Sequence, residues 1–510
     1  MLKFIIPSLL ILSVPQVVIA QIRVPANPTA NPVSAIALLE QANSARARNQ
    51  METALLYYRQ AIAADPTLVL AHYGLAITLR QQGNLTGAIS SQRKAINLDQ
   101  NYLPAHYGLG LALYQKGEMA GAVEAYRKVL SLSESSRENI KQDSQLLVNT
   151  NYNLGLAEEG RKNFTQAISA YRQAIALNAN YALAYSGLGS ALRKQGDLNG
   201  ALAAYNQGIL INPKLIGAYH AVGVLQYERR NFSEAVAAYQ KVSALDPKFA
   251  NLSYNLGIAQ AAQGNLAEAI AAYEQEIKLN PQNFDAYFAL GDALIKQQKL
   301  PEAIAAFRQS LTLFPRSAPA QNGLGLALRR HGDLPGAISA YEQAIQINSR
   351  YAAAYNNYGR ALADQKKLPE AIAAFRKATE IEPNNAIAFS NLGNLFRLQS
   401  NFDGAVTAFK RAIAIGREQV WADHTNLGLA QMAQGDLNSA INSFQRSAVL
   451  QPNYARAHFS LGSLYAQQNE KNKAITAYRE ALRLYQNDKD LEGIERSQEA
   501  LRILTAASSG

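Results

Sequence analysis

The chain has 510 residues, 48% of them hydrophobic and 17% charged, with a net charge of +11 and no cysteine. A chain of this length exceeds one ordinary hydrophobic core, so it predicts several domains or a repeat array, and its composition argues against general disorder. The absence of cysteine excludes disulfides, thiolate metal sites and cysteine nucleophiles. The positive charge is spread without long runs of like charge, which makes it weak evidence for nucleic-acid binding.

Residues 1–20 form an apolar segment with the features of a secretion signal. Lys3 supplies a positive charge near the start, and the small Ala20 precedes a possible cleavage site ahead of Gln21. An uncleaved membrane anchor is the alternative, although the prolines of the segment make it a poor membrane-spanning helix. Residues 21–33 contain three prolines and predict an extended tether. We therefore expect an exported protein, periplasmic or secreted, or membrane-anchored if the leader is retained.

From residue 34 to residue 486 the sequence repeats with a period of 34 residues. One glycine recurs at this spacing from Gly155 to Gly393, and Gly428 and Gly462 continue the series after one extra residue. Small residues at the glycine position and on the second helix allow the two helices of a unit to pack closely. An aromatic residue usually follows the small residue of the second helix, and its ring can fill the groove between neighbouring units. The pattern predicts about thirteen helical hairpins. An alanine lies twelve residues after the glycine position in every unit: Ala54, Ala88, Ala122, Ala167, Ala201, Ala235, Ala269, Ala303, Ala337, Ala371, Ala405, Ala440 and Ala474.

Glycine and proline mark the expected helix ends. Prolines at the start of a second helix suit a position whose N–H has no helical partner, and prolines after that helix stop it. The first group is Pro301, Pro335 and Pro369, and the second is Pro213, Pro247, Pro281, Pro315, Pro383 and Pro452. Glycines that end the first helix are expected to be left-handed. They are Gly83, Gly117, Gly196, Gly264, Gly332 and Gly435.

Two segments depart from the period. About eleven residues are inserted near residues 131–143, and they predict either two lengthened helices or a projecting flap. Residues 487–510 follow the last repeat, and Leu491, Ile494, Leu501 and Leu504 have helical spacing there. This last segment predicts a carboxy-terminal capping helix and tail, which a stack of repeats needs to cover its end.

The period, the alanine and the ring resemble those of the tetratricopeptide repeat over most of the chain. The resemblance implies an all-α fold, a right-handed superhelical solenoid whose first helices line a concave groove. Family members often carry an asparagine two residues before the repeat glycine, facing this groove. The matching residues here are Asn153, Asn255, Asn357, Asn391 and Asn426, and Arg360, Asn394 and Arg397 occupy nearby positions. Amides can pair with a peptide backbone, so these residues are candidate peptide ligands, with a solvated helix face as the alternative.

No constellation in the sequence predicts catalysis, a metal site or a cofactor. His72, His106, His424 and His458 occupy an aromatic position of the repeat and are expected to pack rather than to react. We therefore expect a non-catalytic scaffold that binds other proteins or peptides and not nucleic acid. The alternatives are a substrate-presenting partner of a separate glycosyltransferase and a protein that binds anionic envelope polymer. The chain would be an integral membrane protein only if the leader were uncleaved.

Overall fold

The computed structural model describes residues 32–135 and 144–506. The predicted signal segment 1–20 and most of the predicted tether lie outside the described residues, as do residues 136–143 of the insertion. The first helix begins at Pro32, inside the segment predicted as a tether, because proline fits the first turn of a helix.

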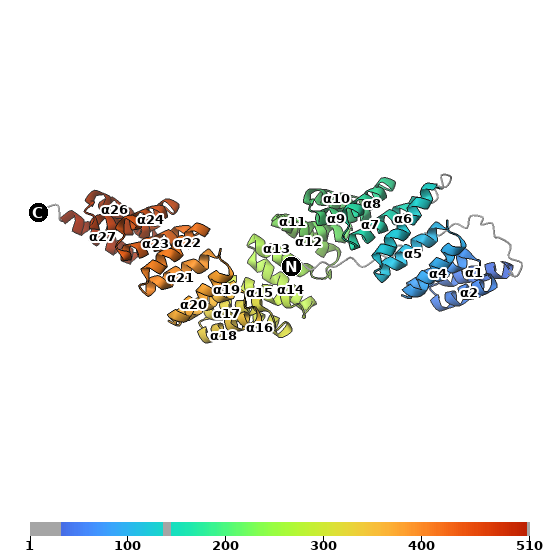
Figure 1. Cartoon of the computed structure of the whole chain (residues 1–510), viewed down its shortest axis with the longest axis horizontal. Coiled ribbons are helices and arrows are strands. Elements are labelled where there is room, and N and C mark those ends of the chain that lie inside the picture. Colours follow the sequence, from blue (N-terminus) through green and yellow to red (C-terminus); the bar gives the residue numbers. More distant parts are fainter. Residues whose placement is uncertain (1–31, 136–143, 507–510) are drawn as a thin grey trace. The chain divides into compact units, whose positions relative to one another are not determined.

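The described part of the chain contains twenty-seven helices and no strand, and it divides into two compact units (Figure 1). Unit 1 ends at Asn265 and unit 2 begins at Leu266. Unit 1 contains α1 (Pro32–Ala47), α2 (Met51–Ala64), α3 (Val69–Gln81), α4 (Leu85–Leu98), α5 (Leu103–Lys116), α6 (Met119–Ser135), α7 (Ser144–Gly160), α8 (Phe164–Leu177), α9 (Ala182–Gln195), α10 (Leu198–Ile211), α11 (Ile216–Glu228), α12 (Phe232–Leu245) and α13 (Leu252–Gln263). Unit 2 contains α14 (Leu266–Leu279), α15 (Phe284–Lys296), α16 (Leu300–Leu313), α17 (Ala318–His331), α18 (Leu334–Ile347), α19 (Ala352–Asp364), α20 (Leu368–Ile381), α21 (Ala386–Leu398), α22 (Phe402–Ile415), α23 (Val420–Gln434), α24 (Leu437–Leu450), α25 (Ala455–Gln467), α26 (Lys471–Asp488) and α27 (Leu491–Ala506).

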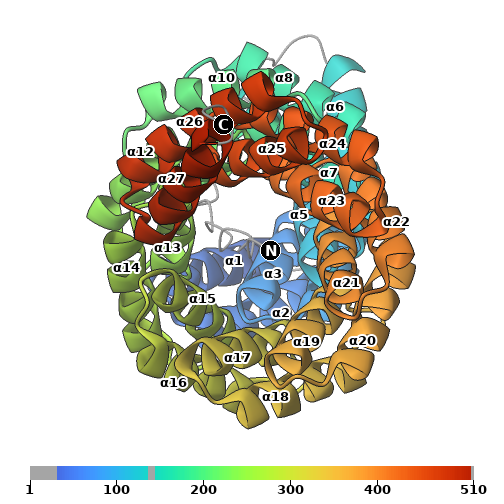
Figure 2. The ribbon, with the colours of Figure 1, turned by 90° about the vertical axis from the view of Figure 1, so that its left-hand side faces the viewer.

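Within each unit, consecutive helices pack as antiparallel hairpins that stack on one another. Each odd-numbered helix from α1 to α25 is the first helix of a repeat. Many of these first helices also contact the first helix of the next repeat, as α3 contacts α5 and α17 contacts α19. In unit 2, Figure 2 shows α15, α17, α19 and α21 on the inside of the curve and α16, α18, α20 and α22 on the outside. The described residues thus form an all-α helical solenoid in each unit. We call the inside of the curve in unit 2 the inner face.

Each hairpin packs through the small residues and the ring that the period singles out. All thirteen alanines of the series are at most 1% exposed. The ring of Phe409 is fully buried, and a Cβ atom added to Gly393 would lie 2.8 Å from it. The ring at this position also contacts the next repeat along the chain. A Cβ atom added to Gly323 would lie 2.5 Å from the ring of Phe307, which belongs to the repeat before it. The prediction that the ring fills the space between neighbouring units is confirmed.

A residue with positive φ follows the first helix in all thirteen repeats. Six of these residues are the predicted glycines, with φ between 80° and 97°. The other seven are not glycine and were not predicted: Asn49, Lys162, Arg230, Gln298, Lys366, Ser400 and Asn469. Their backbones have φ between 59° and 64°, a region that costs an L-residue about 1–2 kcal/mol. Every repeat therefore forms the same left-handed turn, whether or not the residue at this position is glycine.

The segments that interrupt the period differ from a regular repeat. Helices α6 and α7, which flank the insertion, are 17 residues long, whereas α8 and α9 are 14. Lengthened helices therefore account for the described ends of the insertion. At the other end of the chain, α27 packs on α26 through the buried Gly493 and Ser497. Leu491, at the start of α27, takes no part in this packing, because its side chain is 79% exposed.

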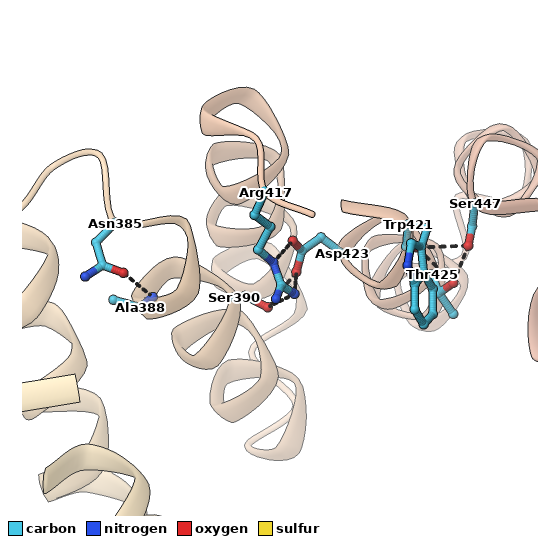
Figure 3. Close-up of polar contacts among 8 residues, drawn as sticks. All are labelled: Asn385, Ala388, Ser390, Arg417, Trp421, Asp423, Thr425 and Ser447. Carbon is cyan, nitrogen blue, oxygen red and sulfur yellow. Dashed lines mark hydrogen bonds and ion pairs between the residues drawn. The ribbon is translucent and has the colours of Figure 1, made fainter. Parts of the chain in front are cut away.

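The repeat with one extra residue carries a buried ion pair in the connection from α22 to α23 (Figure 3). Arg417 donates from Nε to Oδ2 of Asp423 at 2.6 Å and from Nη2 to Oδ1 at 2.8 Å. The Ser390 hydroxyl donates to Oδ1 of the same carboxylate at 2.5 Å, and that carboxylate is fully buried. Ser447 donates to the carbonyl of Trp421 at 2.9 Å and ties the start of α23 to α24. These bonds hold the longer connection against α21 and α24.

Candidate functional site

The asparagine position of the repeat packs against the ring of the preceding repeat. Where this position holds glycine, an added Cβ atom would lie 2.5 Å from that ring, as for Gly187 against Tyr171. An asparagine at this position is therefore packed tightly between two repeats, and only its terminal amide can reach a hydrogen-bond partner.

Four of the five predicted asparagines use the amide nitrogen to bind the preceding repeat. In each case the acceptor is the residue three positions before the glycine position of that repeat. Asn153 donates to the Tyr107 hydroxyl at 2.9 Å, Asn357 to Oδ1 of Asn322 at 3.0 Å, and Asn391 to Oδ1 of Asn356 at 2.9 Å. Asn255 pairs with Nε2 of His220 at 3.1 Å. These amides connect neighbouring repeats, a role that the sequence analysis did not predict.

Asn255 and Asn426 depart from this arrangement in different ways. Asn255 is only 1% exposed, so it is not available to a peptide in this structure. Asn426 is half-buried, and the matching acceptor position of the preceding repeat is Ser390. The Ser390 hydroxyl is already bonded to Asp423 and Arg417. In the repeat with the extra residue, the Ser390 hydroxyl is therefore occupied by other partners and is not the acceptor for Asn426.

The inner face of unit 2 contains a hollow of about 120 Å³ that brings together three of the predicted residues, Arg360, Asn391 and Asn394. The rest of its lining is Arg329, Ala363, Asp364, Phe375 and Leu395. Nε of Arg329 donates to Oδ2 of Asp364 at 2.7 Å, so two of the lining side chains are paired with each other. The other predicted residues do not line it: Asn357, Arg397 and Asn426 belong to unit 2, and Asn153 and Asn255 to unit 1.

The hollow carries an excess of positive charge. Two guanidinium groups, Arg329 and Arg360, line it against the single carboxylate of Asp364. Burial and then the like charge of Arg329 lower the pKa of Arg360, so an added anion would relieve an unfavourable field. The amide of Asn394 has no hydrogen-bond partner among the described residues and is free to bind a ligand. The arrangement suits a ligand that combines carboxylates with peptide groups.

Two acidic residues on first helices, one in each unit, were missed by the sequence analysis. Arg193 and Arg329 occupy the same place relative to the repeat glycine, and each has a carboxylate 35 residues later, Glu228 and Asp364. The structure pairs both at 2.7 Å. The recurring spacing of opposite charges was a signal that the sequence offered and that could have predicted both ion pairs.

A larger hollow of about 420 Å³ lies in unit 1, and none of the predicted residues lines it. Three of its polar side chains already form hydrogen bonds within the fold. Asp197 caps α10 by accepting from the Gly200 amide at 2.8 Å, and Gln195 donates to the Thr165 hydroxyl at 3.1 Å. The smaller hollow of unit 2 is therefore the better candidate site.

Three of the four histidines that were expected to pack contact a backbone carbonyl, and the fourth, His424, is half-buried. His106 is buried, and its Nε2 lies 2.9 Å from the carbonyl oxygen of Gln100. His72 and His458 make the same contact with the carbonyls of Pro66 and Pro452. Among residues 32–135 and 144–506, no group of three metal-ligating side chains could hold a metal ion. In the same part of the chain, no helix has the length and apolar character needed to cross a bilayer.

Comparisons with known proteins identify the repeat. A family model described as tetratricopeptide repeat matches residues 29–69, 98–137, 152–213, 223–284, 266–321, 288–353, 322–386, 359–419 and 425–489. A second model of the same repeat matches residues 78–117. A search of curated protein sequences gives no match.

Several solved structures are similar to the chain at low TM-scores. The APC/C hetero-tetramer Cut9-Hcn1 is 17% identical, with 92% of this chain and 96% of that chain covered and a TM-score of 0.41. Yeast Tom70 is 17% identical, with 82% and 98% covered and a TM-score of 0.38. MamA is 30% identical, with 32% and 96% covered and a TM-score of 0.31.

Proteins built from these repeats are typically non-catalytic scaffolds for protein–protein interaction. The matched residues extend over most of the chain and coincide with the helical hairpins of both units. The chain therefore belongs to the tetratricopeptide-repeat family and is a protein-interaction scaffold.

Proposed function

We propose that the inner face of unit 2 binds extended acidic segments of partner proteins, and that the protein is a non-catalytic adaptor. The observation that carries the proposal is the hollow in which Arg329 and Arg360 outnumber Asp364, with the unpaired amide of Asn394 beside them. Hydrogen bonds to charged groups contribute about 1.5–3 kcal/mol each, so a few of them suffice for micromolar binding only if they act together.

The asparagines that connect repeats take a secondary part in this proposal. In Asn391 the amide nitrogen is bonded to Asn356, while the carbonyl oxygen takes no part in that bond and can accept from a peptide N–H. Because Asn357 and Asn391 also connect repeats, replacing them would change the stack itself. Variants of these residues therefore test stability and binding at once, and Arg360 and Asn394 are the better positions for a test.

The test compares the full-length protein with an Arg360→Ala, Asn394→Ala double variant. Binding of a fluorescein-labelled glutamate-rich peptide is measured by polarisation, with a glutamine version of the same peptide as the ligand control. The double variant should lose at least about tenfold in affinity, the loss expected for one charge-assisted hydrogen bond. Lys377→Ala, on the exposed surface of the outer helix α20, is the matched control and should bind like the parent protein.

The outcomes separate this function from its alternative. Circular dichroism must first show that both variants keep the parent helix content. If the double variant binds the glutamate peptide as tightly as the parent does, the hollow is not the site. Binding of anionic envelope polymer, which the net charge of +11 favours, predicts binding that high salt abolishes in parent and double variant alike.

We also propose that residues 1–20 direct export and are removed. Lys3, the apolar stretch and the small Ala20 support this assignment. Amino-terminal sequencing of the protein from cells that express the full chain should give Gln21 as the first residue. A chain that still begins at Met1 and fractionates with membranes would instead support the uncleaved anchor.

A further inference from the structure

The first helices of five repeats carry an arginine four residues after the glycine position. In the two ion pairs already described, the arginine meets a residue of the next repeat 35 positions later. We call the residue at this position, which lies 36 positions later across the longer repeat, the facing residue. The five arginines are Arg46, Arg80, Arg193, Arg329 and Arg397, and the facing residues are Gln81, Gln115, Glu228, Asp364 and Ala433. Four of the five facing residues have a side-chain oxygen, and the fifth is alanine.

The two pairs with a carboxylate show what the arrangement does. Nη1 of Arg193 lies 2.7 Å from Oε1 of Glu228, and the arginine side chain is 12% exposed. Nε of Arg329 lies 2.7 Å from Oδ2 of Asp364, and that arginine side chain is 19% exposed. At this position of the repeat, an acidic residue of the following repeat neutralises a largely buried guanidinium. A buried charge needs such an opposite charge, because leaving it unpaired is strongly destabilising.

Arg397 has no such acid. Its side chain is half-buried, and its Nε is buried without a hydrogen-bond partner among the described residues. In Arg329 the same atom holds Asp364. The facing residue, Ala433, is exposed and offers no acceptor. A buried donor of a charged group that has no acceptor costs free energy, and an acceptor from outside the chain would recover it.

We propose that a carboxylate of a bound peptide takes the place of the missing acid opposite Arg397. This inference rests on the proposed peptide-binding function and names one specific contact within it. The planar guanidinium fork matches a carboxylate, as it does in the two internal pairs. Asn394 of the hollow lies three residues before Arg397 on α21, so one extended peptide can reach both.

The side chains around Arg397 also indicate which kind of peptide residue lies beside that carboxylate. Leu398 is 62% exposed at the end of α21, and Met432 is 37% exposed near the end of α23. Exposed apolar side chains on the ends of both helices favour a ligand whose acidic residue adjoins an apolar one. Methionine adapts its shape readily, which suits a surface that closes around a peptide.

The test fills the vacant position from within the chain. Ala433→Asp places a carboxylate where Asp364 stands in the earlier pair, and Ala433→Asn is the matched control of nearly equal size without charge. The probe is a short labelled peptide that alternates leucine and glutamate, capped at both ends, with a leucine–glutamine version for comparison. The parent should prefer the glutamate peptide by at least about tenfold.

Ala433→Asp should reduce the affinity for the glutamate peptide at least about tenfold, and Ala433→Asn should leave it within about twofold. Arg397→Gln should resemble Ala433→Asp. A leucine–glutamine peptide with a free carboxy terminus distinguishes a terminal carboxylate from a side-chain one. Since Ala433 is exposed, both variants should keep the parent helix content, which circular dichroism checks.

The inference is overturned if Ala433→Asp binds the glutamate peptide as the parent does, or if the parent does not discriminate glutamate from glutamine. If Ala433→Asp binds normally while Arg360→Ala, Asn394→Ala does not, the proposed function stands and the contact with Arg397 is wrong. If the parent binds neither peptide, the proposed function fails together with this inference.

Discussion

Replacing a left-handed lysine by glycine should stabilise this protein, which is the reverse of what the same change does in a helix. Lys366 has φ 62° and an exposed side chain. Its amide donates to Ala363 at 2.9 Å, and the next amide donates to Leu362 at 2.9 Å. The turn at Gly332 makes the equivalent pair of bonds. Lys366→Gly therefore removes the steric strain of a Cβ atom without removing a hydrogen bond.

The size of the effect follows from two opposing terms. The left-handed conformation costs an L-residue about 1–2 kcal/mol, whereas the extra freedom of glycine in the unfolded chain returns roughly 0.5–1 kcal/mol of that. We expect a net gain of about 0.5–1 kcal/mol in the free energy of unfolding for Lys366→Gly. The turns lie in different repeats, so their effects should add. Glycine at Lys162, Arg230, Gln298, Lys366 and Ser400 together should therefore give roughly 2.5–5 kcal/mol.

Urea unfolding followed by circular dichroism measures this difference. Lys377→Gly, in the middle of helix α20, is the matched control and should lose about 1 kcal/mol, because there glycine replaces a good helix former. A lower free energy of unfolding for Lys366→Gly, as in the control, would refute this explanation. So would a variant with all five glycine substitutions that is no more stable than the parent.

Three further changes test other parts of the fold. Burial lowers the pKa of His220 to about 4, so the unfolded state takes up the proton first and stability should fall by up to about 3 kcal/mol from pH 6.5 to 4. His220→Tyr should remove that part of the loss in urea unfolding at pH 7 and pH 4.5, and an unchanged pH dependence would contradict it. Asp423→Asn should cost about 3 kcal/mol in thermal unfolding because it leaves the Arg417 charge unpaired, and adding Arg417→Gln should restore part of the loss, which a purely additive result would disprove. Gly393→Ala should cost about 1–3 kcal/mol since its Cβ atom would lie 2.8 Å from the buried Phe409 ring, and a variant as stable as the parent would show that the ring can move.

The hairpins, their packing positions and several of their ends could be predicted from the sequence. Helix formation depends on residues three and four apart, and a 34-residue period repeats the same local instructions in every unit. Ala303 and Phe307 therefore have the burial that their place in the repeat predicts. The left-handed glycines, such as Gly332, and the prolines that begin second helices, such as Pro335, likewise act through their own backbone.

The partners of polar side chains were decided by tertiary structure. Asn357 and Asn391 were assigned to a ligand because of their place in the repeat, yet each amide donates to a residue of the preceding repeat 35 positions away. The same place is almost fully buried at Asn255. Which groups meet across two hairpins depends on the direction of each side chain and on the neighbours that compete for the same acceptor, and the sequence does not state these.

The extra residue before Gly428 illustrates the same division. Its presence is plain in the spacing of the glycines, whereas the buried bond between Arg417 and Asp423 that accommodates it appears only when α21, α22 and α23 are packed together. A solenoid of tetratricopeptide repeats follows from the amino-acid sequence, because local periodicity governs helices. Which charges and amides remain free on the inner face depends on contacts between residues far apart in the chain, so the packed helices are needed to show it.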